Sequence, residues 1–581
     1  MIKLPSITAS KIDLKKPTKN ASTDHQSMSS NQSKMSDNDS TVKKSTPSTS
    51  FLPQINDSAL KPAVSNSSTS KVPTGSTSIV KFSNGDIYNG SIVDGRMDGE
   101  GIYKWVLNGE YSGTWKDNSP HGRGTRTWPS GDKYIGQWIN GKRHGRGKHL
   151  WASGDVYDGD WKDDQRTGKA TYLWPGGNKY IGDFVAGEQI GTGTYIWVDG
   201  STYNGQWKKG NMHGKGIRTY ADGSVYDGEW RNHKKNGKGN FKWKDGGEYN
   251  GDWKEDSFDG QGTRTWVSGD KYIGQWINGK KHGRGKYLWS DGDFYDGDWK
   301  DGQRTGKGTF LWADGTKYIG DFVAGERTGH GTQMRPSGDK YIGQWTNDKM
   351  HGRGKHLWAS GDVYDGDWKD DQRTGKGTFV SASGTKYIGD YVADERTGKG
   401  THIWEDGSTY NGQFKKGYLH GKGIRTYANG NVYDGEWMNS KRHGKGNLKW
   451  KDGGEYNGEW KEDNFDGQGT RTWASGNKYI GQWINDKMHG RGKHLWPDGN
   501  VYDGDWKDNQ MAGKGTFVSA DGSKYIGDFV AGNRTGNGTQ TWPSGAKYVG
   551  QYQNNQLHGL GQYTWPDGTI RVGQWNNGQQ C

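Results

Sequence analysis

The sequence predicts an all-β protein: an elongated, single-layer antiparallel sheet of consecutive β-hairpins, each 23 residues long, preceded by a disordered N-terminal tail. Three observations predict this fold. A tyrosine recurs every 23 residues from Tyr88 to Tyr548, through 21 repeats without an insertion or deletion. Tryptophan and glycine keep the same period, and only 29% of the residues are hydrophobic, too few for a large aliphatic core. A fixed period of this length indicates a stack of small units, none of which buries a core alone.

Residues 1–77 form the segment that we expect to be disordered. They are rich in Ser, Thr, Asn, Lys and Pro and contain no Trp. Ten Lys, no Arg and five Asp give this segment +5 of the formal net charge of +13. Such a composition cannot bury enough apolar surface to fold. We interpret it as a solvated tail, and a short docking motif near residues 2–14 or 51–55 is the alternative.

The cysteine content and the hydropathy of the chain indicate a soluble protein of a reducing compartment. The single cysteine, Cys581, excludes an intramolecular disulfide. No apolar run approaches the roughly 18 to 20 residues that span a bilayer, and the N-terminus lacks the apolar stretch of a signal peptide. We therefore expect a cytoplasmic location.

Residues 78–581 form the repeat array. Positions are counted from the tyrosine of each repeat, which is position zero. In the repeat that starts at Tyr134, the periodic residues are Gly136 (plus two), Trp138 (plus four), Gly145 (plus eleven), Gly147 (plus thirteen), Trp151 (plus seventeen) and Gly154 (plus twenty). All 31 tryptophans of the chain lie at plus four or plus seventeen. The aromatic residues therefore belong to the repeat and not to separate sites.

Each repeat contains two strands and two turns. Successive side chains of a strand point to opposite faces, so Tyr134, Gly136 and Trp138 share one face. The pair Asn140–Gly141 supplies the strongest short hairpin signal, since both residues accept a positive φ. A second turn, at Gly154, joins each hairpin to the next. Four or five glycines in 23 residues exclude a helix.

The glycines in phase with the aromatic residues predict how the rings pack. A glycine has no Cβ, so its backbone offers a flat surface on which a ring from a neighbouring strand can lie. We expect the rings to replace a second layer. The opposite face carries Ile, Asp or Asn at plus one, Gln, Asp or Glu at plus three, and Arg or Lys at plus twelve. That face should be solvated, with opposite charges paired across strands.

The repeat resembles the MORN repeat, a family named for membrane occupation and recognition. The form YxGxWxxxxxxGxGxxxWxxG, as in YIGQWINGKRHGRGKHLWASG from Tyr134, recurs along residues 78–581. The resemblance implies an elongated, twisted, single antiparallel sheet. It also implies roles at junctions between membranes, in ciliary and flagellar structures, in basal-body or budding scaffolds, and in lipid-kinase regulation. In that family the tyrosines, tryptophans and glycines are structural, so the resemblance implies no catalytic residue.

The array contains 21 full hairpins and a half hairpin at each end, which predicts 44 strands. At about 4.8 Å per strand, a flat ribbon of that many strands would be roughly 210 Å long. Both edge strands lack a partner, which predicts a homodimer through open edge strands. Residues 134–340 and 341–547 are duplicate blocks, because the 25 residues from Gly145 recur identically from Gly352.

No group of residues in the array predicts catalysis, a cofactor or a metal. Nine histidines share position plus ten, but a row at this spacing puts them about 10 Å apart, too far to share an ion. We interpret Asp158 and Asp160 of the YDGDW sequence as ion-pair partners of nearby Lys and Arg, with calcium binding or acid–base chemistry as the alternative. No glycine-rich motif precedes a helix, which argues against nucleotide binding. We expect no nucleic-acid partner, since the rings are committed to glycine backbone.

The basic stretch in each hairpin is the candidate binding site. Residues 78–581 contain 69 Lys and Arg and 61 Asp and Glu, a formal charge of +8 that is under half a charge per repeat, so we interpret the stretch first as a solvated surface. The alternatives are contact with anionic lipid headgroups, at about 1 kcal/mol per basic residue, and contact with an acidic protein such as tubulin. The candidate binding residues are Lys142, Arg143, Arg146, Lys148, Lys280, Lys281, Arg284 and Lys286.

These observations predict a non-enzymatic scaffold or spacer that mediates protein–protein contacts at cytoskeletal, ciliary or membrane-associated structures. One alternative is a peripheral membrane module that binds anionic phospholipids. Another is a regulatory partner of a lipid kinase that acts in trans. The 77 residues outside the array leave no room for a catalytic domain, so we expect no enzymatic activity.

Overall fold

The computed structural model describes residues 77–581, and this part of the chain contains 45 β-strands and no helix. All 45 strands belong to one antiparallel sheet, which confirms the predicted all-β, single-sheet fold. Residues 77–581 accordingly include no helix that could cross a membrane. The predicted tail, residues 1–77, lies outside the described residues except for its last residue.

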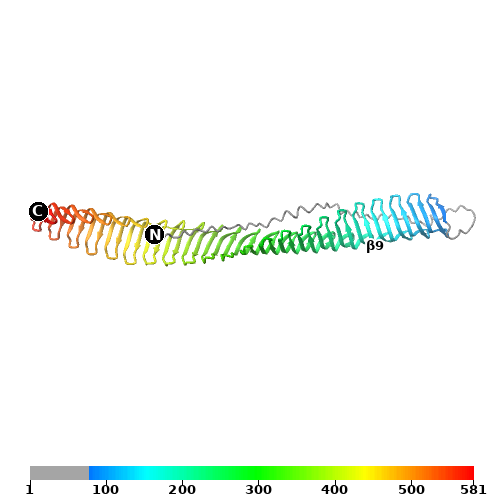
Figure 1. The fold of residues 1–581 in the computed structure, drawn as a ribbon, viewed down its shortest axis with the longest axis horizontal. Coiled ribbons are helices and arrows are strands. Elements are labelled where there is room, and N and C mark those ends of the chain that lie inside the picture. Colours follow the sequence, from blue (N-terminus) through cyan, green and yellow to red (C-terminus); the bar gives the residue numbers. More distant parts are fainter. Residues whose placement is uncertain (1–76) are drawn as a thin grey trace, which may run out of the picture. The chain divides into compact units, whose positions relative to one another are not determined.

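The sheet divides into two compact units. Unit 1 comprises residues 77–313 and 322–325 of the described chain, and unit 2 comprises residues 314–321 and 326–581. The strand β22 (Lys317–Val323) takes residues from both. Within each unit, the strands follow one another in chain order, and each pairs antiparallel with the strands before and after it (Figure 1).

The strands of unit 1 are β1 (Thr77–Lys81), β2 (Ile87–Val93), β3 (Arg96–Trp105), β4 (Gly109–Lys116), β5 (Ser119–Thr127), β6 (Lys133–Ile139), β7 (Lys142–Leu150), β8 (Val156–Lys162), β9 (Gln165–Leu173), β10 (Lys179–Val185), β11 (Glu188–Ile196), β12 (Thr202–Lys208), β13 (Asn211–Thr219), β14 (Val225–Arg231), β15 (Lys234–Lys242), β16 (Glu248–Lys254), β17 (Ser257–Thr265), β18 (Lys271–Ile277), β19 (Lys280–Leu288), β20 (Phe294–Lys300) and β21 (Gln303–Leu311).

The strands of unit 2 are β23 (Glu326–Met334), β24 (Lys340–Thr346), β25 (Lys349–Leu357), β26 (Val363–Lys369), β27 (Gln372–Val380), β28 (Lys386–Val392), β29 (Glu395–Ile403), β30 (Thr409–Lys415), β31 (Tyr418–Thr426), β32 (Val432–Met438), β33 (Lys441–Lys449), β34 (Glu455–Lys461), β35 (Asn464–Thr472), β36 (Lys478–Ile484), β37 (Lys487–Leu495), β38 (Val501–Lys507), β39 (Gln510–Val518), β40 (Lys524–Val530), β41 (Asn533–Thr541), β42 (Lys547–Gln553), β43 (Gln556–Thr564), β44 (Ile570–Asn576) and β45 (Gln579–Gln580).

The described chain has one strand more than the 44 predicted. After a turn at Asn577–Gly578, residues Gln579 and Gln580 pair with Asn576 and Trp575 of β44 and form β45. The sequence count treated only the first strand of this last hairpin as present. Two residues beyond the turn are enough to start the returning strand.

The first turn of each repeat is the type I′ hairpin turn that the sequence predicts. Asn140 and Gly141 have φ angles of 49° and 77°, positive at both central positions as this turn requires. Several repeats have Asp or Asn in place of the glycine. In the next repeat Asp164 takes φ 72°, and its carboxylate accepts a hydrogen bond from the Arg143 amide at 3.0 Å. The side chain thus ties one turn to the turn before it.

The tyrosine rings lie on glycine backbone, as predicted. A Cβ added to Gly147 would overlap the hydroxyl oxygen and Cζ of Tyr134, and a Cβ on Gly136 would overlap the Cα of Gly147. Both glycines are opposite each other in the ladder between β6 and β7. A side chain at Gly147 would therefore meet the Tyr134 ring itself.

The core is a chain of tyrosine and tryptophan rings on one face of the sheet. Tyr134 is fully buried and meets Trp138 of its own repeat edge-on, with ring centroids 5.0 Å apart. It meets Trp161 of the next repeat in the same way at 5.4 Å. The Trp161 Nε1 donates a hydrogen bond to the Gly147 carbonyl at 3.1 Å. Each tyrosine therefore joins its own repeat to the following one.

Candidate functional site

The two faces of the sheet have different chemistry. We call the face that carries positions zero, plus two, plus four, plus nine, plus thirteen, plus fifteen and plus seventeen the aromatic face. We call the face that carries positions plus one, plus three, plus twelve and plus fourteen the open face. The residues of the predicted basic stretch are divided between the two faces, because side chains of a strand alternate.

Arg143 and Lys281, at plus nine, lie on the aromatic face. The Arg143 guanidinium lies 4.3 Å from the ring centre of Trp161, and its Nε donates to Asp164 at 2.9 Å. Lys281 is buried, with its Nζ 4.4 Å from the ring centre of Tyr287 and 4.8 Å from that of Trp299. Cations in such positions stabilise the aromatic rows. They are not placed to meet a lipid headgroup.

Arg146, Arg284 and Lys286 lie on the open face, each beside carboxylates of the next strand. Arg146 approaches Asp160 at 3.5 Å and Asp158 at 3.9 Å. Six repeats further along the chain, Arg284 and Lys286 make the equivalent ion pairs with Asp296 and Asp298, at 3.4 to 3.6 Å. The open face therefore presents cations and carboxylates together, as the prediction of ion pairing across strands requires.

Lys142, Lys148 and Lys280 are exposed and make no ion pair with any residue of the described range 77–581. Lys148 is nevertheless opposite Asp158 in the ladder between β7 and β8. These three lysines are the part of the predicted basic stretch that is free to meet an anion.

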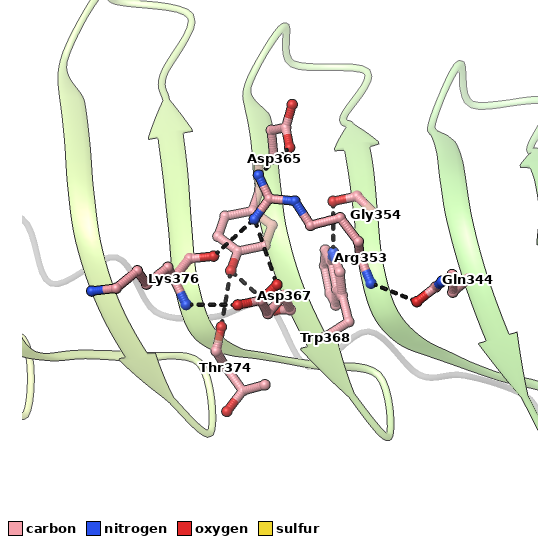
Figure 2. A network of polar contacts seen from close by, with 9 residues as sticks. Gln344, Arg353, Gly354, Asp365, Asp367, Trp368, Thr374 and Lys376 are labelled. Atoms are coloured by element: carbon pink, nitrogen blue, oxygen red, sulfur yellow. Dashed lines mark hydrogen bonds and ion pairs between the residues drawn. The ribbon is translucent and has the colours of Figure 1, made fainter.

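Figure 2 shows the open face around Arg353. Its guanidinium approaches Asp365 at 3.3 Å and Asp367 at 3.5 Å, and donates to the Lys376 carbonyl at 3.4 Å. Asp367 also accepts the backbone amide of Lys376 at 2.9 Å, and the Gln344 side chain accepts that of Arg353 at 3.0 Å. The residue at plus three thus has a structural role, because it holds the amide at plus twelve where the ladder is interrupted by a bulge.

Alternation places His149, at plus fifteen, on the face of Gly145, Gly147 and Trp151, but the sequence analysis assigned no packing role to this position, which completes the aromatic face. Arg126 is buried with its guanidinium 3.5 Å from the ring centre of Trp105, and burial lowers its pKa to about 10. His149 stacks on Trp151 at 4.1 Å. Burial, with the neighbouring Arg143 charge, lowers the pKa of His149 to about 3. The signal was present, since plus fifteen alternates in phase with the glycines at plus eleven and plus thirteen.

The histidine row at plus ten does not form a metal centre in the described chain. Among residues 77–581, no three His, Cys, Asp or Glu side chains converge as metal ligands would. His144 instead lies with its Nδ1 3.7 Å from a carboxylate oxygen of Asp163 in the next turn. This contact becomes an ion pair only when the imidazole is protonated.

The fold and its surfaces define a repeat protein. Its repeated unit is a β-hairpin in which a tyrosine ring lies on glycine backbone, and consecutive hairpins form the sheet. The family model of the MORN repeat matches 21 segments of the chain: residues 88–106 and twenty consecutive 23-residue segments from 111–133 to 548–570. The chain therefore belongs to the MORN repeat family. No curated protein matches the chain.

Solved structures that match the chain are distant. The TCP10 domain of Danio rerio CPAP is 13% identical, with 35% of this chain and 95% of that chain covered and a TM-score of 0.21. The TCP domain of Drosophila melanogaster SAS-4, in complex with a proline-rich motif of Ana2, is 14% identical, and the match covers 35% of this chain and 90% of that chain with a TM-score of 0.14. Virginiamycin B lyase from Staphylococcus aureus is also 14% identical, and the match covers 47% of this chain and 85% of that chain with a TM-score of 0.10. At these TM-scores none of them supports an inference about this chain.

Proposed function

We propose that the array is a non-enzymatic scaffold or spacer whose open face binds protein partners at several equivalent places. The structures in which we expect it are cytoskeletal, ciliary or membrane-associated. The aromatic face is committed to packing, because its tyrosines and its plus-four rings are buried and its cations pack on those rings. Contacts with partners then fall to the open face.

The observation that carries this proposal is a row of exposed aliphatic side chains among the charges of the open face. Position plus one is Ile or Val in nine repeats and is 42 to 49% exposed in all of them. The nine residues are Ile135, Ile181, Ile273, Ile319, Ile342, Ile388, Ile480, Ile526 and Val549. Apolar side chains repeated among polar ones are suited to contact with another protein surface.

Localisation of a tagged full-length chain tests this proposal. We expect the wild type to concentrate on a cytoskeletal, ciliary or membrane structure. A variant in which Ile135, Ile181, Ile342 and Ile480 become Asn should lose that localisation and keep its fold, because Asn occupies plus one in other repeats, as at Asn204. A diffuse wild-type signal, or unchanged localisation of the variant, would count against the open face as the binding surface. A copy without residues 1–77 shows whether that segment contributes.

Binding to anionic phospholipids is the second candidate, favoured by the exposed Lys142, Lys148 and Lys280. We expect such binding to require phosphatidylserine or phosphoinositide in the vesicle and to weaken at high salt, because screened charges attract less. Vesicle co-sedimentation with the wild type and the K142Q/K148Q/K280Q variant measures this. Equal binding to neutral phosphatidylcholine vesicles would argue against it. Regulation of a lipid kinase in trans and homodimerisation through open edge strands stay predictions.

A further inference from the structure

We propose that the open face is a self-complementary surface on which a second copy of this chain docks, through pairs of identical squares of charge, of which each unit has two. Each square joins two neighbouring strands. One strand supplies two cations, at plus twelve and plus fourteen, and the next strand supplies two carboxylates, at plus three and plus one. This inference goes beyond the scaffold role, since it names one partner and the residues that recognise it.

The first square lies on β7 and β8. Arg146 is opposite Asp160 in the ladder, and Lys148 is opposite Asp158. Both cations belong to the sequence HGRGK and both carboxylates to YDGDW. Three further squares have the same residue types in the same register: Arg284, Lys286, Asp298 and Asp296 on β19 and β20; Arg353, Lys355, Asp367 and Asp365 on β25 and β26; Arg491, Lys493, Asp505 and Asp503 on β37 and β38.

The squares are placed alike in the two compact units. Unit 1 holds those on β7–β8 and β19–β20, and unit 2 holds those on β25–β26 and β37–β38. In each unit the two squares begin twelve strands apart. Either unit of one copy therefore presents the same pair of contacts to either unit of another.

The charges of a square remain available although they pair within the chain. The side chains of Arg146, Asp158 and Asp160 are 61%, 49% and 43% exposed. Ion pairs that are this open to water are weak, so they leave the groups able to take a second partner. Two cations and two carboxylates leave no net charge on a square. A strongly acidic or strongly basic partner gains little from it, whereas a copy with the same pattern matches it charge for charge.

The symmetry of the square specifies how two copies meet. Within unit 1, a two-fold axis that runs parallel to the strands between β13 and β14 lies midway between the two squares. It places β7 of one copy over β20 of the other, so that a cation strand lies over a carboxylate strand in both squares. Arg146 then faces Asp298 of the second copy, and Lys148 faces its Asp296. Such an isologous contact uses each pairing twice, which is the usual arrangement in homodimers.

Apolar side chains frame each square in a way that suits the same symmetry. Ile135 of β6 is opposite Lys148, and Thr171 of β9 is opposite Asp158, so all four residues lie in one row across the sheet. The two-fold axis between β13 and β14 brings Ile135 of one copy over Thr309 of the other, the residue opposite Asp296 in the second square. The exposed isoleucine then contacts a threonine methyl group at the edge of each charge square.

Charge-swapped full-length variants test this proposal by sedimentation velocity. In the first variant, D158K/D296K/D365K/D503K, the plus-one and plus-fourteen positions of every square are both cations. In the second variant, K148E/K286E/K355E/K493E, the same two positions are both carboxylates. We expect the wild type to dimerise, each variant alone to dimerise at least about tenfold more weakly, and an equal mixture of the two variants to recover the dimer. Asp160 and its equivalents stay unchanged, because they hold backbone amides of the next strand.

A matched variant controls for net charge. D163K/D301K/D370K/D508K makes the same charge change in the same four repeats at the hairpin turn, where Lys occurs naturally at Lys209 with the same positive φ. It should dimerise like the wild type. A wild type that stays monomeric, swapped variants that associate like the wild type, or a control that loses the dimer overturns the proposal. Recovery in the mixture also shows that the swapped variants are folded.

Discussion

Replacing Tyr134 with alanine tests whether rings on glycine hold the sheet together. The Tyr134 side chain is fully buried and lies over Gly147. It meets Trp138 and Trp161 edge-on at 5.0 and 5.4 Å, and its hydroxyl donates to the Gln137 carbonyl at 3.0 Å. Alanine at this position removes all of these contacts at once.

The contacts set the size of the expected effect. Removing a buried aromatic side chain costs about 3 to 5 kcal/mol of unfolding free energy. The hydrogen bond contributes about 1 kcal/mol of this, and each edge-on ring contact about 0.5 to 1.5 kcal/mol. The glycines beneath the ring have no side chains that can fill the gap. We therefore expect about 4 kcal/mol for Y134A and about 1 kcal/mol for Y134F.

Amide hydrogen exchange measured by mass spectrometry is the assay, because a repeat protein contacts only its neighbours and loses stability locally. Amides of β5 to β8 should exchange much faster in Y134A than in the wild type, and those of β35 to β38 should not change. The control I135N alters the same strand on the open face and should have little effect. Unchanged exchange in β5 to β8 of Y134A would refute the reasoning, since it would mean that the Tyr134 ring does not contribute to the stability of these strands.

Three further predictions concern the glycine floor, the buried histidine and the turns. G147V should lower the unfolding free energy by about 3 kcal/mol in the wild type, where Tyr134 lies over Gly147, and by less than about 1 kcal/mol in the Y134A variant. Urea unfolding measures both effects, and equal effects in the two proteins would contradict direct contact between ring and glycine. His149 has a folded pKa of about 3 against 6.5 unfolded, so its contribution to stability is fully present above pH 6.5 and is lost as the pH falls towards 3, by about 2 kcal/mol at pH 5. H149F should remove that part of the loss, and exchange rates in β7 at pH 7 and pH 5 check it; the same loss in both proteins would disprove it. D164A removes the hydrogen bond from the Arg143 amide and keeps a side chain at positive φ, so it should lower the unfolding free energy by about 1 to 2 kcal/mol. D164G should lower it less, because glycine accepts a positive φ. Thermal unfolding that ranks the two variants the other way would contradict this.

The strands and turns of the array were predictable because the local signals agree. Period-two alternation placed Tyr134, Gly136 and Trp138 on one face, and the structure buries the tyrosine and tryptophan there. The pair Asn140–Gly141 predicted a type I′ turn, and both residues have positive φ. No long-range information was needed, since each repeat contacts the next in chain order.

The placement of the candidate binding residues was less predictable, because the sequence analysis took the cations of each hairpin as one basic stretch. Arg143 and Arg146 are three residues apart, so alternation places them on opposite faces. The first packs on Trp161 and the second pairs with carboxylates. Alternation alone would have separated them. It would not have shown that Lys281 is buried among rings, because whether a long cationic side chain packs or reaches solvent depends on the rings around it.

The most direct test of the proposal that two copies of this chain associate through their open faces is lysine labelling at two protein concentrations. The chain is exposed briefly to an acetylating reagent when concentrated and when highly diluted, and modification of each lysine is read by mass spectrometry. We predict that Lys148, Lys286, Lys355 and Lys493 are modified more slowly in the concentrated sample, while Lys142 and Lys280 are modified equally in both. Equal modification of all six lysines at both concentrations, or protection of Lys142 and Lys280 instead, would contradict the account.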